Sequence, residues 1–291
     1  MDLASGAPDA VSVTVAIDRR AWCRVETGVS GVSIESRDTL RKASGQSVAE
    51  VLEGGTLGLV ARVLRAMGVE AGVRVVTQLR VPEGSGLGES TALGAAVAGA
   101  VARVLERKLD REEIARVASE AEAGVGEPGT KEGHTAVRGG ALALHPETGG
   151  VRVETLAVDP ARIEESLLLV EGARSPGAVP AGAALRRVAS RLYDALRAGR
   201  FEDVVGLWAE EWEARRGPGW PAPESARIAE VVGAAGGGTR VCGAGRGAIL
   251  AVWAPPGARG PGRREAVLAA AKAAGLRLFP ARVDLRGLDV E

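Results

Sequence analysis

One glycine-rich loop, set between a strand and a helix, constrains the fold of this chain more than any other feature. The run GVRVVTQLRV (Gly72 to Val81) alternates as a strand does and leads directly into PEGSGLGEST. A helix of small residues, ALGAAVAGAVARVLE, follows. Glycines let the backbone approach a ligand closely, and a helix N-terminus presents amides and a favourable dipole. This order of strand, glycine loop and helix predicts a nest that binds phosphate.

The loop matches neither of the two common nucleotide-binding fingerprints. It lacks the Gly-Lys-Ser/Thr of the P-loop and the GxGxxG of dinucleotide-binding folds. The alternative is a merely structural turn, which a lone GxG often is, but this pattern is longer. We expect the loop to bind a cofactor that carries phosphate groups. The residues expected to do so are Pro82, Gly84, Ser85, Gly86, Leu87, Gly88, Glu89, Ser90 and Thr91.

Strands and helices are mixed along the rest of the chain without strict alternation. AVSVTVAI and LLLVE read as strands, and GGALAL with VRVETLAV reads as a hairpin. Helices are expected from Ser47 to Met67, from Asp110 behind a capping box with Glu113, and over 183–198 and 201–215. The fold class is therefore α+β.

The helix predicted over 201–215 carries apolar and charged residues at helical spacing. Trp208 and Trp212 are four residues apart, which indicates one packing face. Glu210 and Glu211, followed by Arg215 and Arg216, are typical of a solvated helix surface with ion pairs four residues apart.

Composition limits the functional classes that this chain can belong to. Its 37 acidic residues balance 37 basic ones, and no basic stripe is interleaved with aromatics, which argues against nucleic acid or an anionic membrane as partner. Cys23 and Cys242, the only cysteines, have no metal-ligand spacing and read as buried thiols. There is no signal peptide pattern and no membrane-spanning apolar run. We expect a cytoplasmic protein.

Four segments, in order, resemble the GHMP kinase superfamily, which includes galactokinase, homoserine kinase, mevalonate kinase and phosphomevalonate kinase. PEGSGLGESTALGAA is similar to its ATP-binding PxxxGLGSSxA motif, and GVGEPGTKEGHTAVRGGALAL to its loop with the catalytic aspartate. TRVCGAGRGAILAVWAP resembles its third motif, a Cys-Gly-Ala-Gly-Gly-Gly turn, and AVSVTVAIDRRAW an early strand. The resemblance is nearest to D-glycero-D-manno-heptose 7-phosphate kinases and fucokinase-like sugar kinases.

The resemblance implies two lobes, 1–160 and 161–291. The first would have a ribosomal-protein-S5-like β-α arrangement that binds ATP, and the second a ferredoxin-like split β-α-β arrangement. It also implies that the two glycine turns lie together around one phosphate site. The expected cofactors are ATP and Mg²⁺, the expected substrate is a sugar or sugar phosphate, and a homodimer is possible.

Family roles carry over only where residues match. Ser90 and Glu122 would hold magnesium. Glu132 would take the place of the catalytic aspartate, with Lys131 beside it. Residues expected near the substrate are His134, Arg174, Gly243, Ala244 and Gly245.

Several positions depart from the family pattern. Glu89 replaces the first serine of the GLGSS pair, Glu132 is longer than aspartate, and Arg246 replaces a glycine. The family's first motif, a strand that ends in a glycine run and Thr-Asp, is not visible. These departures leave a second hypothesis open, a catalytically impaired paralogue that binds a nucleotide or sugar as a regulatory or assembly protein.

Overall fold

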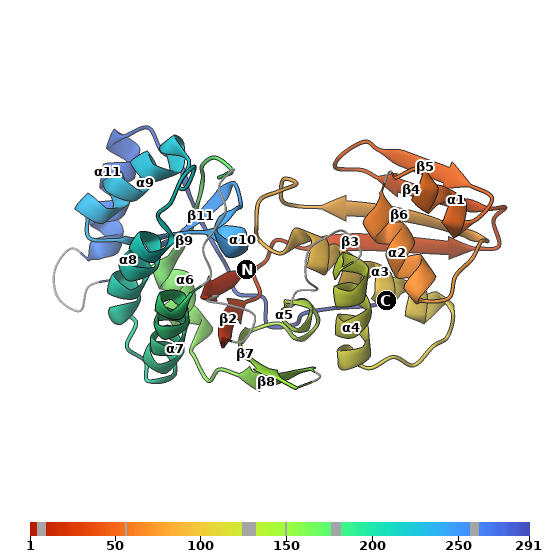
Figure 1. Cartoon of the computed structure of the whole chain (residues 1–291), viewed down its shortest axis with the longest axis horizontal. Coiled ribbons are helices and arrows are strands. Elements are labelled where there is room, and N and C mark those ends of the chain that lie inside the picture. Colours follow the sequence, from red (N-terminus) through yellow and green to blue (C-terminus); the bar gives the residue numbers. More distant parts are fainter. Residues whose placement is uncertain (5–9, 56, 124–131, 149, 176–181, 257–261) are drawn as a thin grey trace. The chain divides into compact units, whose positions relative to one another are not determined.

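The structure is a computed structural model that describes residues 1–4, 10–55, 57–123, 132–148, 150–175, 182–256 and 262–291. These residues form two compact units, each assembled from separate stretches of chain (Figure 1). The first unit contains 1–18, 84–87 and 140–284, and the second contains 19–83, 88–139 and 285–291. The predicted division at residue 160 is not one of these boundaries and stays a prediction.

The first unit contains two four-stranded sheets. One has the order β1-β2-β7-β8, formed by β1 (Asp2–Ala4), β2 (Ser12–Val15), β7 (Ala141–Glu147) and β8 (Gly150–Thr155). All its neighbouring strands are antiparallel. The predicted hairpin is confirmed, because β7 and β8 pair from Leu142 opposite Thr155 to Glu147 opposite Gly150.

The second sheet of this unit has the order β10-β11-β9-β12, again antiparallel. Its strands are β9 (Leu167–Glu171), β10 (Gly238–Val241), β11 (Ile249–Trp253) and β12 (Leu278–Pro280). In sequence order this is the 4-1-3-2 arrangement of a split β-α-β fold, read from the β12 edge. The predicted ferredoxin-like arrangement is therefore confirmed.

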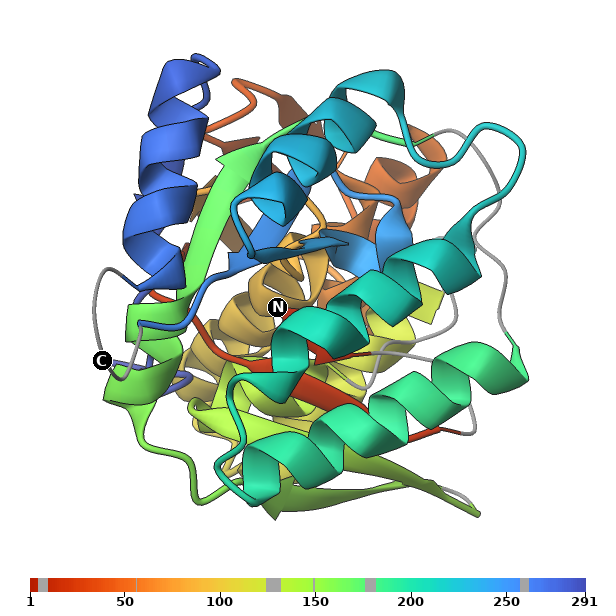
Figure 2. The ribbon, with the colours of Figure 1, turned by 90° about the vertical axis from the view of Figure 1, so that its left-hand side faces the viewer.

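The first unit also contains helices. They are α6 (Pro160–Ser166), α7 (Ala183–Arg197), α8 (Asp203–Arg215), α9 (Pro223–Ala234), the short α10 (Cys242–Gly245) and α11 (Arg263–Ala273). Figure 2 shows α7 and α8 side by side, with α9 and α11 near one another. One apolar core of this unit includes Leu168, Trp212, Ile228, Leu250 and Val267. The helices predicted over 183–198 and 201–215 correspond to α7 and α8, each of which buries apolar residues at helical spacing.

The second unit is one sheet with helices. The sheet has the order β3-β6-β4-β5, with β3 (Ala21–Thr27), β4 (Val32–Ser36), β5 (Lys42–Gly45) and β6 (Val73–Leu79). Strand β6 runs parallel to β4, and the other two pairs are antiparallel. The helices are α1 (Val48–Glu53), α2 (Gly58–Ala66), α3 (Glu89–Val104), α4 (Arg111–Ala123) and α5 (Gly133–Arg138). They share one apolar core with the sheet, which includes Ile34, Leu64, Val75, Val97 and Ala118.

Two local predictions in this unit have opposite outcomes. The capping box before α4 is confirmed: the Glu113 amide donates to Asp110 Oδ1 at 2.9 Å, and the Asp110 amide donates to Glu113 Oε2 at 2.8 Å. The single helix from Ser47 to Met67 is wrong, because α1 ends at Glu53 and α2 begins at Gly58. Gly55, with a φ of +69°, interrupts the helical backbone between them.

No helix in the described ranges is long and apolar enough to cross a membrane.

Candidate functional site

The glycine loop has an alternating backbone conformation. Gly84, Gly86 and Gly88 have φ values of +79°, +79° and +83°, a region that residues with a Cβ rarely adopt. Between them, Ser85 is fully buried, and its Oγ accepts a hydrogen bond from the Leu87 amide at 3.2 Å. Residues 84–87 are grouped with the first unit and Gly88 onward with the second.

In the first unit the loop packs directly against the glycine turn that follows β10. A Cβ on Gly86 would lie 2.8 Å from the carbonyl carbon of Cys242, and one on Gly243 would lie 2.7 Å from the Cα of Gly86. The Ala248 amide donates to the Gly84 carbonyl at 3.0 Å. The expectation that the two glycine turns lie together is confirmed. The glycines make this approach possible because two backbones meet where side chains would not fit.

Arg174 lies over the same loop. A Cβ on Gly84 would be 3.0 Å from Nη1 of Arg174, and the Arg174 side chain is exposed. The next residue, Ser175, is buried, and its Oγ accepts a hydrogen bond from the Ala222 amide at 3.1 Å. The structure thus brings the predicted residues Arg174 and Gly84 together, with a guanidinium beside the loop.

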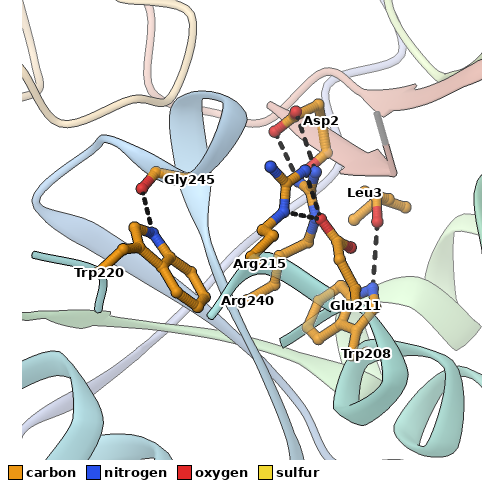
Figure 3. A network of polar contacts seen from close by, with 8 residues as sticks. All are labelled: Asp2, Leu3, Trp208, Glu211, Arg215, Trp220, Arg240 and Gly245. Carbon is orange, nitrogen blue, oxygen red and sulfur yellow. Dashed lines mark hydrogen bonds and ion pairs between the residues drawn. The ribbon is translucent and has the colours of Figure 1, made fainter. Parts of the chain in front are cut away.

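Arg240, on the strand β10 that precedes the glycine turn, belongs to a buried charge network (Figure 3). Arg240, 2% exposed, donates to Asp2 Oδ1 at 2.7 Å and to Glu211 Oε2 at 2.8 Å. Burial lowers the pKa of Arg240, but the charges of Asp2 and Glu211 outweigh burial and raise the pKa well above its ordinary value. Arg215 also donates to Glu211, at 2.7 Å. The prediction that Glu211 and Arg215 are solvated is wrong, because both are at most 4% exposed.

In the second unit, a carboxylate lies at the N-terminus of α3. The carboxylate of Glu122, on α4 and 4% exposed, accepts hydrogen bonds from Thr91 Oγ1 at 2.7 and 2.8 Å and one from Ser90 Oγ. The predicted pair Ser90 and Glu122 is therefore in contact. Mg²⁺ in phosphate sites is often held by one or two carboxylates together with the substrate phosphates, so these donors fit it.

The predicted catalytic carboxylate lies at the same helix end. A Cβ on Gly88, the residue before α3, would be 3.4 Å from Oε2 of Glu132. Glu132 is half-buried and immediately precedes α5. The first residue of α5, Gly133, packs so closely against α4 that a Cβ there would lie 2.9 Å from the Ala115 carbonyl oxygen. This packing sets the position of the helix start beside Glu132. Glu132 and Gly88 are thereby next to one another within one unit.

The other predicted site residues are Pro82, Glu89, Lys131, His134 and Ala244. His134 Nδ1 lies 3.0 Å from Oε2 of Glu112 on α4, and burial lowers the pKa of His134. Pro82 is exposed, and Glu89 lies in the first turn of α3, where an acidic side chain is favourable to the helix dipole. Lys131 and the side chain of Ala244 lie outside the described residues.

Comparison with known proteins identifies the fold. Residues 55–136 match the family model described as the GHMP kinases N terminal domain. A crystal structure of a D-glycero-D-manno-heptose 1-phosphate kinase from Bacteriodes thetaiotaomicron superimposes with a TM-score of 0.78 at 22% identity, over 99% of this chain and 94% of that chain. This chain has the GHMP kinase fold. The superfamily resemblance is confirmed, and with it the α+β class.

Other GHMP-type structures match over almost the whole length. L. major mevalonate kinase, solved with R-mevalonate, has a TM-score of 0.70 at 18% identity, over 99% of this chain and 94% of that one. A putative sugar kinase from Campylobacter jejuni gives the same four values. No curated protein sequence matches the chain. Because the similar proteins include both a heptose 1-phosphate kinase and a mevalonate kinase, the GHMP fold does not choose among substrates.

Sequence reasoning did not find three parts of this arrangement. In the Asp2–Arg240–Glu211 network, Arg240 pairs with one residue 238 positions away and another 29 positions away, so the network has no local pattern. The indole N–H of Trp220, in a Pro/Gly-rich stretch, donates to the Gly245 carbonyl at 2.7 Å (Figure 3). The third part is the hydrogen bond from the Thr91 hydroxyl to the Glu122 carboxylate. The only sequence signal for this bond is that Thr91 directly follows Ser90, the predicted partner of Glu122.

Proposed function

We propose that this protein is an ATP- and magnesium-dependent kinase that phosphorylates a hydroxyl group of a sugar or sugar phosphate. The observation that carries this proposal is the pairing of Ser90 with Glu122 at the N-terminus of α3, with Glu132 beside Gly88. GHMP kinases use ATP with Mg²⁺, and a hydroxyl paired with a carboxylate at a helix N-terminus supports the assignment of Ser90 and Glu122 as the magnesium ligands.

Each group has a distinct role in the proposed reaction. The amides of the glycine loop and the start of α3 would bind the nucleotide phosphates, and Arg174 would add positive charge. Glu122 and Ser90 would hold Mg²⁺, which supplies charge neutralisation on the phosphates. Glu132 would orient the attacking hydroxyl and accept its proton. Phosphoryl transfer depends mainly on such positioning and charge stabilisation.

The sugar substrate is the finer part of the proposal. It is supported by the sequence resemblance to heptose-phosphate and fucokinase-like kinases and by the similarity to the heptose 1-phosphate kinase. We expect such an enzyme to be cytoplasmic, and a homodimer stays a prediction.

A second candidate is an impaired paralogue that binds a nucleotide or sugar without turning it over. The substitutions at Glu89 and Arg246 favour it, because a carboxylate among phosphate-binding amides is unfavourable unless a cation intervenes. Titration of Mg²⁺–ATP by calorimetry, followed by ATP turnover against a panel of sugars and sugar phosphates, separates the two. Binding with turnover supports the kinase; binding alone supports the paralogue. If the protein binds no nucleotide, both the kinase and a paralogue that binds a nucleotide are contradicted.

Magnesium dependence provides a residue-level test. Glu122→Gln removes the charge of the proposed ligand, and we expect it to raise the Mg²⁺ concentration needed for half-maximal turnover by roughly tenfold or more. Glu120→Gln is the control, since Glu120 lies on the same helix but is exposed and paired with Arg116 at 2.7 Å. Equal Mg²⁺ dependence in the two variants would mean that Glu122 is not a magnesium ligand.

A further inference from the structure

A short stretch after α8, residues 217–222, contacts the surroundings of the glycine loop at two points within the first unit. At the first point, the Trp220 indole N–H donates to the Gly245 carbonyl at 2.7 Å (Figure 3). Gly245 ends α10, the short helix whose Cys242 and Gly243 backbone packs against Gly86. The Trp220 side chain is therefore hydrogen-bonded to the turn that packs against the glycine loop.

The second point is at Ser175, the chain neighbour of Arg174, which lies beside the first glycine of the loop. The Ala222 amide donates to Ser175 Oγ at 3.1 Å, and both residues are 5% exposed. Ser175 directly follows Arg174, whose guanidinium lies over Gly84. Residues 217–222 thus make two contacts. One is with Gly245 of α10, the helix that packs against Gly86, and the other is with Ser175, which follows Arg174.

The stretch has its own support. Gly217 and Trp220 exchange backbone hydrogen bonds of 3.0 and 3.4 Å. The Trp220 ring, 4% exposed, packs against Trp212 of α8 with ring centroids 5.0 Å apart. A buried side chain that is packed on one side and hydrogen-bonded on the other has little freedom, so it can fix the position of its acceptor.

We propose that residues 217–222 position the nucleotide-binding loop, and that Trp220 and Ser175 are positioning residues for it. This inference rests on the proposed function, in which residues 84–87 bind nucleotide phosphates. Since phosphate contacts by backbone amides depend on the backbone being held in place, loosening Gly245 or Arg174 would weaken nucleotide binding without removing a ligand contact.

Trp220→Phe tests the first contact, because it keeps an aromatic ring against Trp212 and removes the N–H donor, together with part of the ring volume that a control must also lose. The chain provides two matched controls. Trp208 donates to the Leu3 carbonyl at 3.1 Å (Figure 3), and Trp253 donates to the Phe201 carbonyl at 3.0 Å. Both rings are fully buried in the same unit. Trp208→Phe and Trp253→Phe therefore lose the same type of bond, but to carbonyls that do not belong to the glycine turn.

Two measurements on these proteins separate positioning from general stability. Amide hydrogen exchange of the unliganded protein reports on residues 84–87 and 243–247, and calorimetry with Mg²⁺ and the ATP analogue AMP-PNP reports on binding. We expect Trp220→Phe to speed exchange in those two segments and to raise the dissociation constant for AMP-PNP, each roughly fivefold, as the loss of one hydrogen bond gives. The controls should lose thermal stability while both readouts stay within about twofold of the parent.

Ser175→Ala tests the second contact and keeps the inference testable should Trp220→Phe not fold. Its control is Ser166→Ala, which removes a buried hydroxyl bonded to the Arg162 carbonyl at 2.8 Å. We expect faster exchange around residues 84–87 in the Ser175 variant alone.

The outcomes are distinct. Unchanged exchange in the Trp220 and Ser175 variants, or equal changes in the variants and their controls, would overturn the positioning role. If the parent binds no AMP-PNP, the proposed nucleotide function fails, whereas the exchange data still decide whether residues 217–222 hold the loop. Faster exchange with unchanged AMP-PNP affinity would overturn the link to nucleotide binding.

Discussion

Thr91 Oγ1 lies 2.7 and 2.8 Å from the two carboxylate oxygens of Glu122, which is only 4% exposed. A buried carboxylate needs such donors, since an unsatisfied charge in the interior is costly. The contact joins the first turn of α3 to the last turn of α4. It therefore ties the fold of the second unit to the geometry of the proposed metal-binding pair.

This contact predicts an asymmetry between two threonines. Thr91→Val keeps the shape of the side chain but removes the donor, and we expect it to lower the free energy of unfolding by about 1–3 kcal/mol. Thr77→Val is the control, because the Thr77 hydroxyl, also buried, makes only a 3.4 Å bond to the neutral Glu35 carbonyl. Urea denaturation measures both. An equal loss in the two variants would show that Glu122 does not depend on Thr91.

Gly86 is predicted to be essential for stability as well as for nucleotide binding. Gly86→Ala places a Cβ 2.8 Å from backbone atoms at a φ of +79°, and we expect a loss of about 3 kcal/mol or more. Gly199→Ala separates the two causes, since Gly199 has a φ of +70° with open space around it and should cost about 1 kcal/mol. Thermal denaturation compares them. Similar losses would mean that the close approach of the two loops contributes nothing.

Glu132→Gln should reduce turnover by roughly 10²- to 10⁴-fold and leave AMP-PNP binding within about twofold, because the amide cannot accept the proton. Glu132→Asp, which shortens the side chain, tests whether the carboxylate position matters. Steady-state kinetics and calorimetry measure the two effects separately. Full activity in Glu132→Gln would identify a different group as the base.

The two thiols should be unreactive in the native protein. Burial raises the pKa of both Cys23 and Cys242 to about 12, and only the thiolate reacts with disulfide reagents. At pH 8 the thiolate fraction is then on the order of 10⁻⁴, and it rises about tenfold with each pH unit while the fold persists. We expect labelling with Ellman's reagent to be slow at pH 8 and to reach both cysteines in denaturant. Fast labelling of the folded chain at pH 8 would contradict this burial.

The sequence alone determined the local elements around the glycine loop. The strand before Pro82, the glycines after it and the helix of small residues are adjacent in the chain, so their order could be read directly. The capping box of Asp110 and Glu113 was visible because its two members are three residues apart. Such features depend on local propensity and periodicity, which a single sequence records.

The tertiary structure alone decided which distant residues meet. Trp220 bonds to Gly245, and Asp2 pairs with Arg240. Neither pair follows from spacing along the chain, because burial among distant segments sets both. The same reason explains the wrong assignment of Glu211 and Arg215, whose spacing of four fits a solvated helix face and a buried ion pair equally well. Only the strands and helices packed around them decide between the two.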